Sequence, residues 1–191
     1  MMSKSQKKLY GVILFGSLVG FIASFWQLLE KLTLLKNSAA PLSCNLNSVF
    51  SCTNVLNAPQ SSVFGFPNSL LCIILFTIAI VAAIVGLTGT KIARGVRFSF
   101  QFLALFTVFF GLWYLWQSIF NLGAMCIFCV FCFGGVLTIN AAWFRLNYSD
   151  YPISKSVKRK LDAGVAKGAD IFFWCLIGLV VVAEAVIKFT N

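Results

Sequence analysis

Two long stretches of this chain contain no charged residue: one lies between Lys36 and Lys91, and the other between Arg97 and Arg145. A helix of about 20 apolar residues crosses the hydrocarbon core of a bilayer, so the second stretch alone has room for two crossings. Only 10% of the residues are charged, whereas soluble domains average about 25%. The sequence therefore predicts an all-α, polytopic membrane protein.

Five apolar segments are long enough to form membrane helices. They are residues 9–29, 69–88, 98–120, 124–144 and 170–188. Lys4, Lys7 and Lys8 precede the first segment, as in a secretory signal peptide. That segment is longer than a signal-peptide core of about 7–15 residues, and no cleavage site of small residues closes it. We therefore expect it to be retained as a helix and residues 1–191 to form a single integral membrane domain.

The basic residues are distributed unevenly between the two sides of the membrane that these segments define. If the N-terminus is cytoplasmic, twelve of the 15 Lys and Arg residues lie inside and three lie outside. Cytoplasmic loops of membrane proteins carry such an excess of basic residues. The net charge of +10 therefore indicates topology rather than nucleic-acid binding, and residues 145–169 are expected to be a solvated cytoplasmic linker.

The predicted outer side holds one long segment, residues 30–68, and one tight turn at residues 121–123. From residue 37 to residue 68 the long segment carries no charge, but it contains many Ser and Asn residues together with large apolar ones. A freely solvated loop normally carries charge. We therefore expect an extracytoplasmic cap loop that is folded down onto the helix ends.

Cys126 and Cys129 form the motif Cys-Ile-Phe-Cys at the start of segment 124–144. A spacing of three places both sulfurs on one helix face and suits a redox dithiol. The dipole at a helix N-terminus favours a thiolate, mainly on Cys126, and the thiolate is the reactive form. Phe133 follows on the same face, so we expect the dithiol to lie above an apolar groove that runs into the bilayer.

A second cysteine pair, Cys44 and Cys52, lies in the predicted cap, where a disulfide would persist in an oxidising compartment. Alone, this pair would most simply be a staple, and a Cys-x-x-Cys in an apolar helix would be a coincidence. Two pairs on one side of the membrane favour a relay by thiol–disulfide exchange. A four-thiolate zinc site is disfavoured by the irregular spacing of the first pair and the lipid-embedded position of the second, so no metal is expected.

Other features of the predicted helices carry weaker signals. Gly16 and Gly20 match the small-residue motif at which membrane helices approach closely. Glu184, near the outer end of the last segment, is an intramembrane carboxylate and hence a functional candidate by default, or it reaches water there. Three further cysteines are interpreted as packing residues: Cys72, Cys132 and Cys175.

Both cysteine pairs belong to a longer ordered pattern. Ser51 precedes Cys52, residues 61–70 read Ser-Ser-Val-Phe-Gly-Phe-Pro-Asn-Ser-Leu, and Cys126-Ile-Phe-Cys129 then opens the fourth segment. Over about residues 9–145 this set resembles the vitamin K epoxide reductase family in its bacterial, disulfide-forming form. Both pairs together with the Phe-Gly-x-Pro-Asn-Ser stretch make the resemblance specific, whereas either pair alone would not.

The resemblance implies a four-helix transmembrane bundle around a quinone, with a cap helix over it and a fifth transmembrane helix in addition. Cys129 would face the quinone. Cys126 would exchange with the cap pair through Cys52, and Cys44 would face the partner protein. Asn68 matches the family position that hydrogen-bonds a quinone carbonyl, and it would also serve as a helix N-cap.

Two departures from the family pattern refine this expectation. Vertebrate members carry a Tyr four residues after the second Cys of the motif, and it bonds the other quinone oxygen. This chain has Phe133 there, which would line the quinone site but cannot donate a hydrogen bond, so plain quinone reduction is favoured over epoxide reduction. Many bacterial members also fuse a thioredoxin-like domain after the fifth helix. This chain ends at Asn191, so the expected partner is a separate thioredoxin-like oxidant protein.

The expected function is quinone-linked thiol oxidation at the cell (inner) membrane, with the active site on the periplasmic or extracellular side. Electrons would pass from the partner to Cys44–Cys52, then to Cys126–Cys129, and then to a quinone of the ubiquinone, menaquinone or phylloquinone type. The alternatives are reduction of a quinone epoxide such as that of vitamin K, and a non-catalytic scaffold or small transporter with a stapled loop. The convergent four-helix disulfide oxidase fits less well, because its Cys-x-x-Cys lies in the first outside loop.

Overall fold

The computed structural model describes residues 3–47 and 49–190. Within these ranges five helices are long and apolar enough to cross a membrane, which confirms the prediction of an all-α, polytopic membrane protein. The α-helices are α1 (Lys4–Lys36), α2 (Cys52–Asn57), α3 (Ser69–Leu87), α4 (Arg94–Trp116), α5 (Ile127–Asn147), α6 (Lys155–Ala166) and α7 (Ala169–Thr190). Short 3₁₀ turns follow at Pro59–Ser62 and Tyr148–Asp150, and a π-helical turn at Gln117–Leu122 extends α4.

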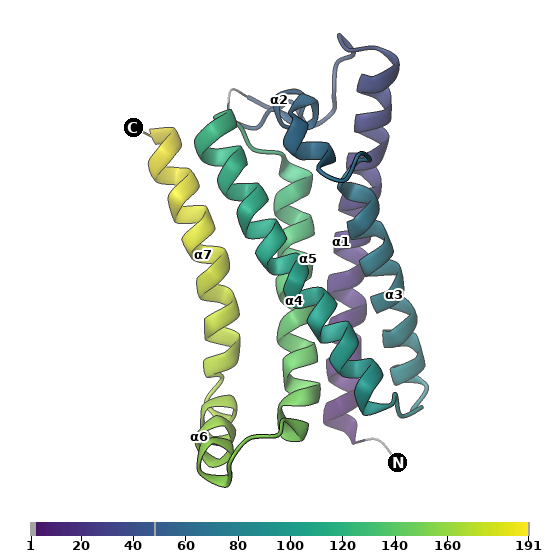
Figure 1. The fold of residues 1–191 in the computed structure, drawn as a ribbon, viewed down its shortest axis with the longest axis vertical. Coiled ribbons are helices and arrows are strands. Elements are labelled where there is room, and N and C mark those ends of the chain that lie inside the picture. The colour runs from purple at the N-terminus through teal and green to yellow at the C-terminus, as the bar shows by residue number, and fades with distance from the viewer. Residues whose placement is uncertain (1–2, 48, 191) are drawn as a thin grey trace.

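Four of these helices form a bundle, and α7 lies outside it. Helix α1 packs along both α3 and α5, while α4 packs across α5. Helix α7 contacts α5 and the π-helical end of α4, and it stands beside the bundle in Figure 1. The short helix α2 lies at one end of the bundle, whereas the N-terminus and α6 lie at the other. The bundle therefore has a capped end and an opposite end, at which α1 begins and α6 lies.

Glycines allow α1 and α5 to approach closely at mid-height, as the Gly16–Gly20 motif predicts. A Cβ atom added at Gly135 of α5 would lie 2.7 Å from the carbonyl oxygen of Gly16 and 3.1 Å from the Cα of Gly20. A Cβ added at Gly20 would lie 2.0 Å from the ring of Phe76 on α3. Only hydrogen fits at these positions, so the contact between the two central helices is made by backbone atoms.

Several helix boundaries differ from the sequence-based expectation. Helix α1 was expected over 9–29 but runs from Lys4 to Lys36, because hydropathy marks only the part of a helix that lies in lipid. Its last turns therefore enter the segment predicted as cap loop 30–68. The tight turn expected at 121–123 is instead the end of the π-helical turn followed by Gly123, whose φ of +61° suits glycine.

The predicted linker 145–169 also contains a helix that hydropathy alone does not reveal. Ser154 is the N-cap of α6, and its side chain accepts a hydrogen bond from the backbone N–H of Val157 at 3.4 Å. Its apolar residues recur four apart at Val157, Leu161 and Val165, which is the pattern of an amphipathic helix. At the start of α7, Asp170 forms an ion pair with Arg145 of α5 at 2.6 Å, which fixes the return of the chain towards the membrane.

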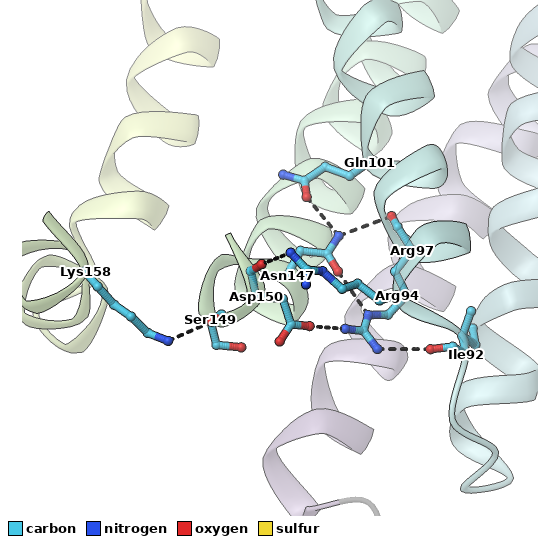
Figure 2. A network of polar contacts seen from close by, with 8 residues as sticks. All are labelled: Ile92, Arg94, Arg97, Gln101, Asn147, Ser149, Asp150 and Lys158. Carbon is cyan, nitrogen blue, oxygen red and sulfur yellow. Dashed lines mark hydrogen bonds and ion pairs between the residues drawn. The ribbon is translucent and has the colours of Figure 1, made fainter. Parts of the chain in front are cut away.

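A polar network fastens α4 to the end of α5, at the end of the bundle opposite the cap (Figure 2). The guanidinium of Arg97 pairs with Asp150 and donates to the side-chain oxygen of Asn147 at 3.0 Å. The Asn147 amide in turn donates to Arg97 O at 3.2 Å and to the side chain of Gln101 at 2.8 Å. Because Asn147 is fully buried, these bonds satisfy groups that would otherwise be costly to bury.

Candidate functional site

The cap carries a disulfide that faces the N-terminal end of α5. Cys44 and Cys52 are joined by a disulfide, with their Cα atoms 5.7 Å apart. Cys52 begins α2, and both half-cystines are almost completely buried, with 1% and 0% of their surface exposed. A side-chain pair between Asn45 and Thr53 closes the same loop, with the amide nitrogen 2.7 Å from the threonine hydroxyl.

Buried charged residues at the end of α1 hold the cap in place. The ammonium group of Lys31 donates to the carbonyl oxygen of Leu56 at the end of α2, and to the hydroxyl of Ser61 at 3.1 Å. Its neighbour Glu30 accepts hydrogen bonds from the backbone N–H of Ser43, at 3.2 Å, and from the Ser43 hydroxyl. Hydrogen bonds of charged groups are stronger than neutral ones, so these two residues position both sides of the cap.

Cys126 stands at the N-cap of α5 in extended conformation, one residue before the helix. The preceding residue, Met125, donates its backbone N–H to Val49 O of the cap at 2.7 Å, and Phe50 forms a β-bridge with it. This backbone pairing brings the two predicted cysteine pairs together: the sulfurs of Cys52 and Cys126 are 3.3 Å apart.

The surroundings of Cys126 favour its ionised form. A hydrogen bond from the Cys129 thiol lowers the pKa of Cys126 below its usual value, and the backbone N–H groups of Phe128 and Cys129 act in the same direction. Burial opposes this effect, but the pKa remains lowered overall. A thiolate is the reactive form in disulfide exchange, so Cys126, whose sulfur faces Cys52, is suited to that exchange.

Cys129 lies one turn deeper, in the wall of an apolar cavity between α1, α3, α4 and α5. The side-chain amide of Gln27, on α1, donates a hydrogen bond to the Cys129 sulfur at 3.2 Å. The cavity is lined by Gln27, Asn68, Ser69, Cys72, Thr107, Phe110, Gly111, Tyr114, Leu115, Cys129, Cys132, Phe133 and Val136. A thiol in a mostly apolar cavity with a few polar groups can meet a flat, apolar ligand that carries polar atoms at its edge.

Asn68 and Phe133 both line this cavity. The expected N-cap role of the Asn68 side chain is not found, because that side chain makes no hydrogen bond to α3. Its amide nitrogen instead donates to Gln60 O at 2.7 Å, and its oxygen accepts from the backbone N–H of Val63 at 3.2 Å. One proton of the Asn68 amide is left for another acceptor.

The three cysteines interpreted as packing residues differ from one another. Cys72 and Cys132 line the cavity beside Cys129, and Cys132 accepts a hydrogen bond from the Ser24 hydroxyl at 3.4 Å. Cys175 is exposed on α7, so its interpretation as a packing residue is wrong. Glu184 lines a separate groove between α4 and α7 and takes no part in the cysteine cluster.

Sequence reasoning missed the contributions of Gln27, Lys31 and Tyr114 to this region. A signal was present for the first two. Ser24, Gln27 and Lys31 recur at spacings of three and four in an otherwise apolar helix, which places them on one face. Polar side chains on one face of a membrane helix point into the protein rather than into lipid.

We expect Lys31→Met to loosen the cap while leaving the membrane bundle intact. The substitution keeps the apolar stem but removes charge-assisted hydrogen bonds, which contribute about 1.5–3 kcal/mol each. The rate at which a water-soluble maleimide alkylates Cys126 in detergent should rise roughly tenfold or more, because about 1.4 kcal/mol corresponds to a factor of ten. Lys36→Met, in the exposed last turn of α1, is the matched control and should leave the rate unchanged. Equal rates in both variants would show that Lys31 does not hold the cap.

Comparison with known protein families identifies the chain. The model of the vitamin K epoxide reductase family matches residues 11–144 of the 191, a range that contains α3, α4, most of α1 and α5, the cap and both cysteine pairs. Comparisons with curated proteins and with solved structures returned no match. Proteins of this family are membrane oxidoreductases that act with quinones, either on thiols or on a quinone epoxide. Because the match covers most of its length, the chain belongs to the vitamin K epoxide reductase family.

Proposed function

We propose that this protein is a quinone-linked thiol oxidase that regenerates the disulfide of a thioredoxin-like partner protein. The observation that carries the proposal is the 3.3 Å approach of the Cys52 and Cys126 sulfurs, with Cys129 directly behind them in the cavity wall. The two pairs form a continuous path from the cap to the membrane interior. A structural staple needs no thiol beside it, so this arrangement favours a relay over a scaffold.

The proposed transfer consists of two exchange reactions at sulfur. The reduced partner attacks Cys44 and leaves Cys44 and Cys52 as thiols, while the partner becomes a disulfide. Cys52 then attacks the oxidised Cys126–Cys129 pair at Cys126, and Cys44 displaces Cys126 to restore the cap disulfide. Two electrons and two protons reach Cys126 and Cys129. The reduction potentials of the partner and the quinone set the direction.

The cavity residues would bind the quinone and orient Cys129 towards it. The quinone supplies an acceptor for two electrons and two protons. Gln27 fixes the Cys129 sulfur by its hydrogen bond, and Phe133 contributes an apolar ring next to Gly111. Asn68 has a free amide proton for a carbonyl oxygen. Apolar rings with few polar groups suit a quinone headgroup of the ubiquinone, menaquinone or phylloquinone type.

The capped end is proposed to face the periplasm or the extracellular space, and the N-terminus the cytoplasm, in a cell (inner) membrane. The excess of basic residues at the opposite end supports this orientation. An oxidising compartment would also preserve the Cys44–Cys52 disulfide, and thioredoxin-like oxidants work in such compartments.

This orientation predicts which side of the membrane each end of the bundle can be labelled from. Single cysteines introduced by Leu46→Cys, in the exposed part of the cap, and by Ser154→Cys, at the start of α6, should react from opposite sides in a background without native cysteines. An impermeant maleimide added to whole cells should modify only the cap position, and lysis should expose the other. Modification of both from outside would contradict the proposed topology.

The activity itself is tested with purified protein in lipid nanodiscs under anaerobic conditions. A reduced thioredoxin-like protein and a naphthoquinone are supplied, and we expect quinone reduction with one partner disulfide formed per quinone reduced. A second reaction with quinone epoxide and a dithiol distinguishes the epoxide reductase alternative. Epoxide reduction without partner oxidation would replace the proposed function, and no thiol-dependent reaction with either acceptor would refute it.

A further inference from the structure

The hydroxyl group of Tyr114 is buried in the protein and has no hydrogen-bond partner among the described residues. Only 7% of the Tyr114 surface is exposed. A buried hydroxyl that finds no partner is destabilising, and buried Tyr hydroxyls usually do find one. Tyr114 lies on α4, where its ring stacks on Phe110 at a centroid distance of 6.5 Å and an interplanar angle of 10°. Its ring is therefore held in place, and its hydroxyl cannot easily turn away towards water.

The cavity that Tyr114 lines is the one that contains Cys129. Three neighbouring polar side chains already make hydrogen bonds within the protein. Gln27 donates to Cys129, the Thr107 hydroxyl donates to Leu103 O at 3.0 Å, and Asn68 uses one amide proton on Gln60 O. The Tyr114 proton is thus available to an acceptor that enters the cavity.

We propose that Tyr114 donates a hydrogen bond to a carbonyl oxygen of the bound quinone, as a second donor beside Asn68. This inference rests on the proposed function, since it needs a quinone in the cavity. Asn68 lies at the start of α3 and Tyr114 on α4, so the two donors reach the cavity from different helices. Such a pair selects ligands that carry two carbonyl oxygens. Phe133, which lines the same cavity, cannot donate a hydrogen bond, so Tyr114 supplies the hydrogen-bond donor that Phe133 lacks.

The hydrogen bond from Tyr114 would favour reduction of the quinone in addition to its binding. When electrons reach the ring, negative charge grows on its oxygen atoms, and a hydrogen-bond donor in an apolar site stabilises such charge strongly. Tyr114 is therefore expected to touch the ligand.

The test compares two ligands on two variants in nanodiscs. The ligands are 2-methyl-1,4-naphthoquinone, with two carbonyls, and 2-methyl-1-tetralone, with one. Dissociation constants are measured by quenching of tryptophan fluorescence. In the native protein the quinone should bind roughly tenfold more tightly than the monoketone, since a buried polar group left unpaired costs that much or more. In Tyr114→Phe the affinity for the quinone should fall roughly tenfold, and the two ligands should bind about equally.

Tyr10→Phe is the matched control, because Tyr10 is also buried but packs edge-to-face on Trp143, with centroids 6.0 Å apart, outside the cavity. It should preserve the preference for the quinone. An unchanged preference in Tyr114→Phe would overturn the inference. Slower exchange between Cys52 and Cys126 in Tyr114→Phe, with native quinone binding, would also overturn it, because the hydroxyl would then act on Cys129 and not on the quinone.

The binding measurement separates failure of this inference from failure of the proposed function. Dissociation constants do not depend on turnover or on the partner protein. A native protein that binds quinone with the expected preference, but oxidises no thiol, would leave the role of Tyr114 standing and refute the thiol oxidase. Normal turnover together with an unchanged ligand preference in Tyr114→Phe would refute the role of Tyr114 and leave the thiol oxidase standing.

Discussion

The Cys129→Ala variant is expected to lose quinone reduction, by a factor on the order of 10³ or more, as is common when a residue that reacts directly is removed. Cys129 is the member of its pair that lines the cavity, whereas Cys126 faces the cap at 3.3 Å from Cys52. Without Cys129 no thiol of the relay reaches the quinone. Quinone absorbance in a stopped-flow experiment with the reduced partner measures the loss.

The double variant Cys44→Ala, Cys129→Ala, prepared in air, should in addition trap a disulfide between Cys52 and Cys126, with oxygen accepting the two electrons and two protons of the two thiols. Each substitution removes the thiol that would otherwise resolve this bond, and the two remaining sulfurs need to move only slightly to join. Digestion without reductant followed by mass spectrometry should find the two peptides linked. A link from Cys126 to any other cysteine, or continued turnover with Cys126 free, would show that the order of transfer is different.

The control for both experiments is Cys175→Ala, which removes an exposed thiol on α7. It should keep the native turnover rate and should not change the pattern of linked peptides. If all four relay cysteines can be replaced without loss of activity, the enzyme does not work through them, and the scaffold alternative gains support.

Gly135→Val is expected to prevent stable assembly of the bundle. The added Cβ would lie 2.7 Å from the carbonyl oxygen of Gly16, on the backbone of α1, and a backbone cannot move aside as a flexible side chain can. Overpacking of a rigid core costs about 1–3 kcal/mol or more, and here it separates the two helices that carry Gln27 and Cys129. A large fall in the thermal unfolding temperature, or loss of monodisperse protein after extraction, would be observed.

Gly134→Ala provides the matched control, because a Cβ at Gly134 meets no atom within 4 Å. It should unfold at the native temperature or slightly above it, since Ala is a better helix former than Gly by about 1 kcal/mol. Equal stability of the two variants would mean that α1 and α5 do not approach as closely as described.

The cysteine pairs could be predicted because residue type and spacing, which determine their chemistry, are visible in the sequence. The membrane helices could be predicted because a helix surrounded by lipid must consist mainly of apolar residues. Contacts between distant helices carry no such local signal. Gln27 and Cys129 are 102 residues apart in the chain and meet only because α1 packs on α5. Tyr114 is one of many aromatic residues in α4, and nothing in its neighbours shows that its hydroxyl lacks a partner.

Helix ends were the least predictable part of the fold, for a physical reason. Hydropathy reports where a helix is in contact with lipid, and α1 continues beyond that zone to Lys36 because its charged residues find partners in the cap. The Asn68 side chain illustrates the same limit. Its position before α3 suggested a local cap, but its amide is used by residues 60–63, which fold back over the start of the helix.

Burial of Cys44, Cys52 and Cys126 has a consequence for which thiols could reduce the proposed relay. Cys44 is 1% exposed, and Cys52 and Cys126 are not exposed at all, so a small thiol such as glutathione reaches them only when the cap opens. If the sulfurs of the proposed relay were exposed, small thiols in the compartment would reduce them, and the electrons would pass on to the quinone. For the proposed thiol oxidase, the buried position of these sulfurs favours a partner protein that displaces the cap over small thiols in solution.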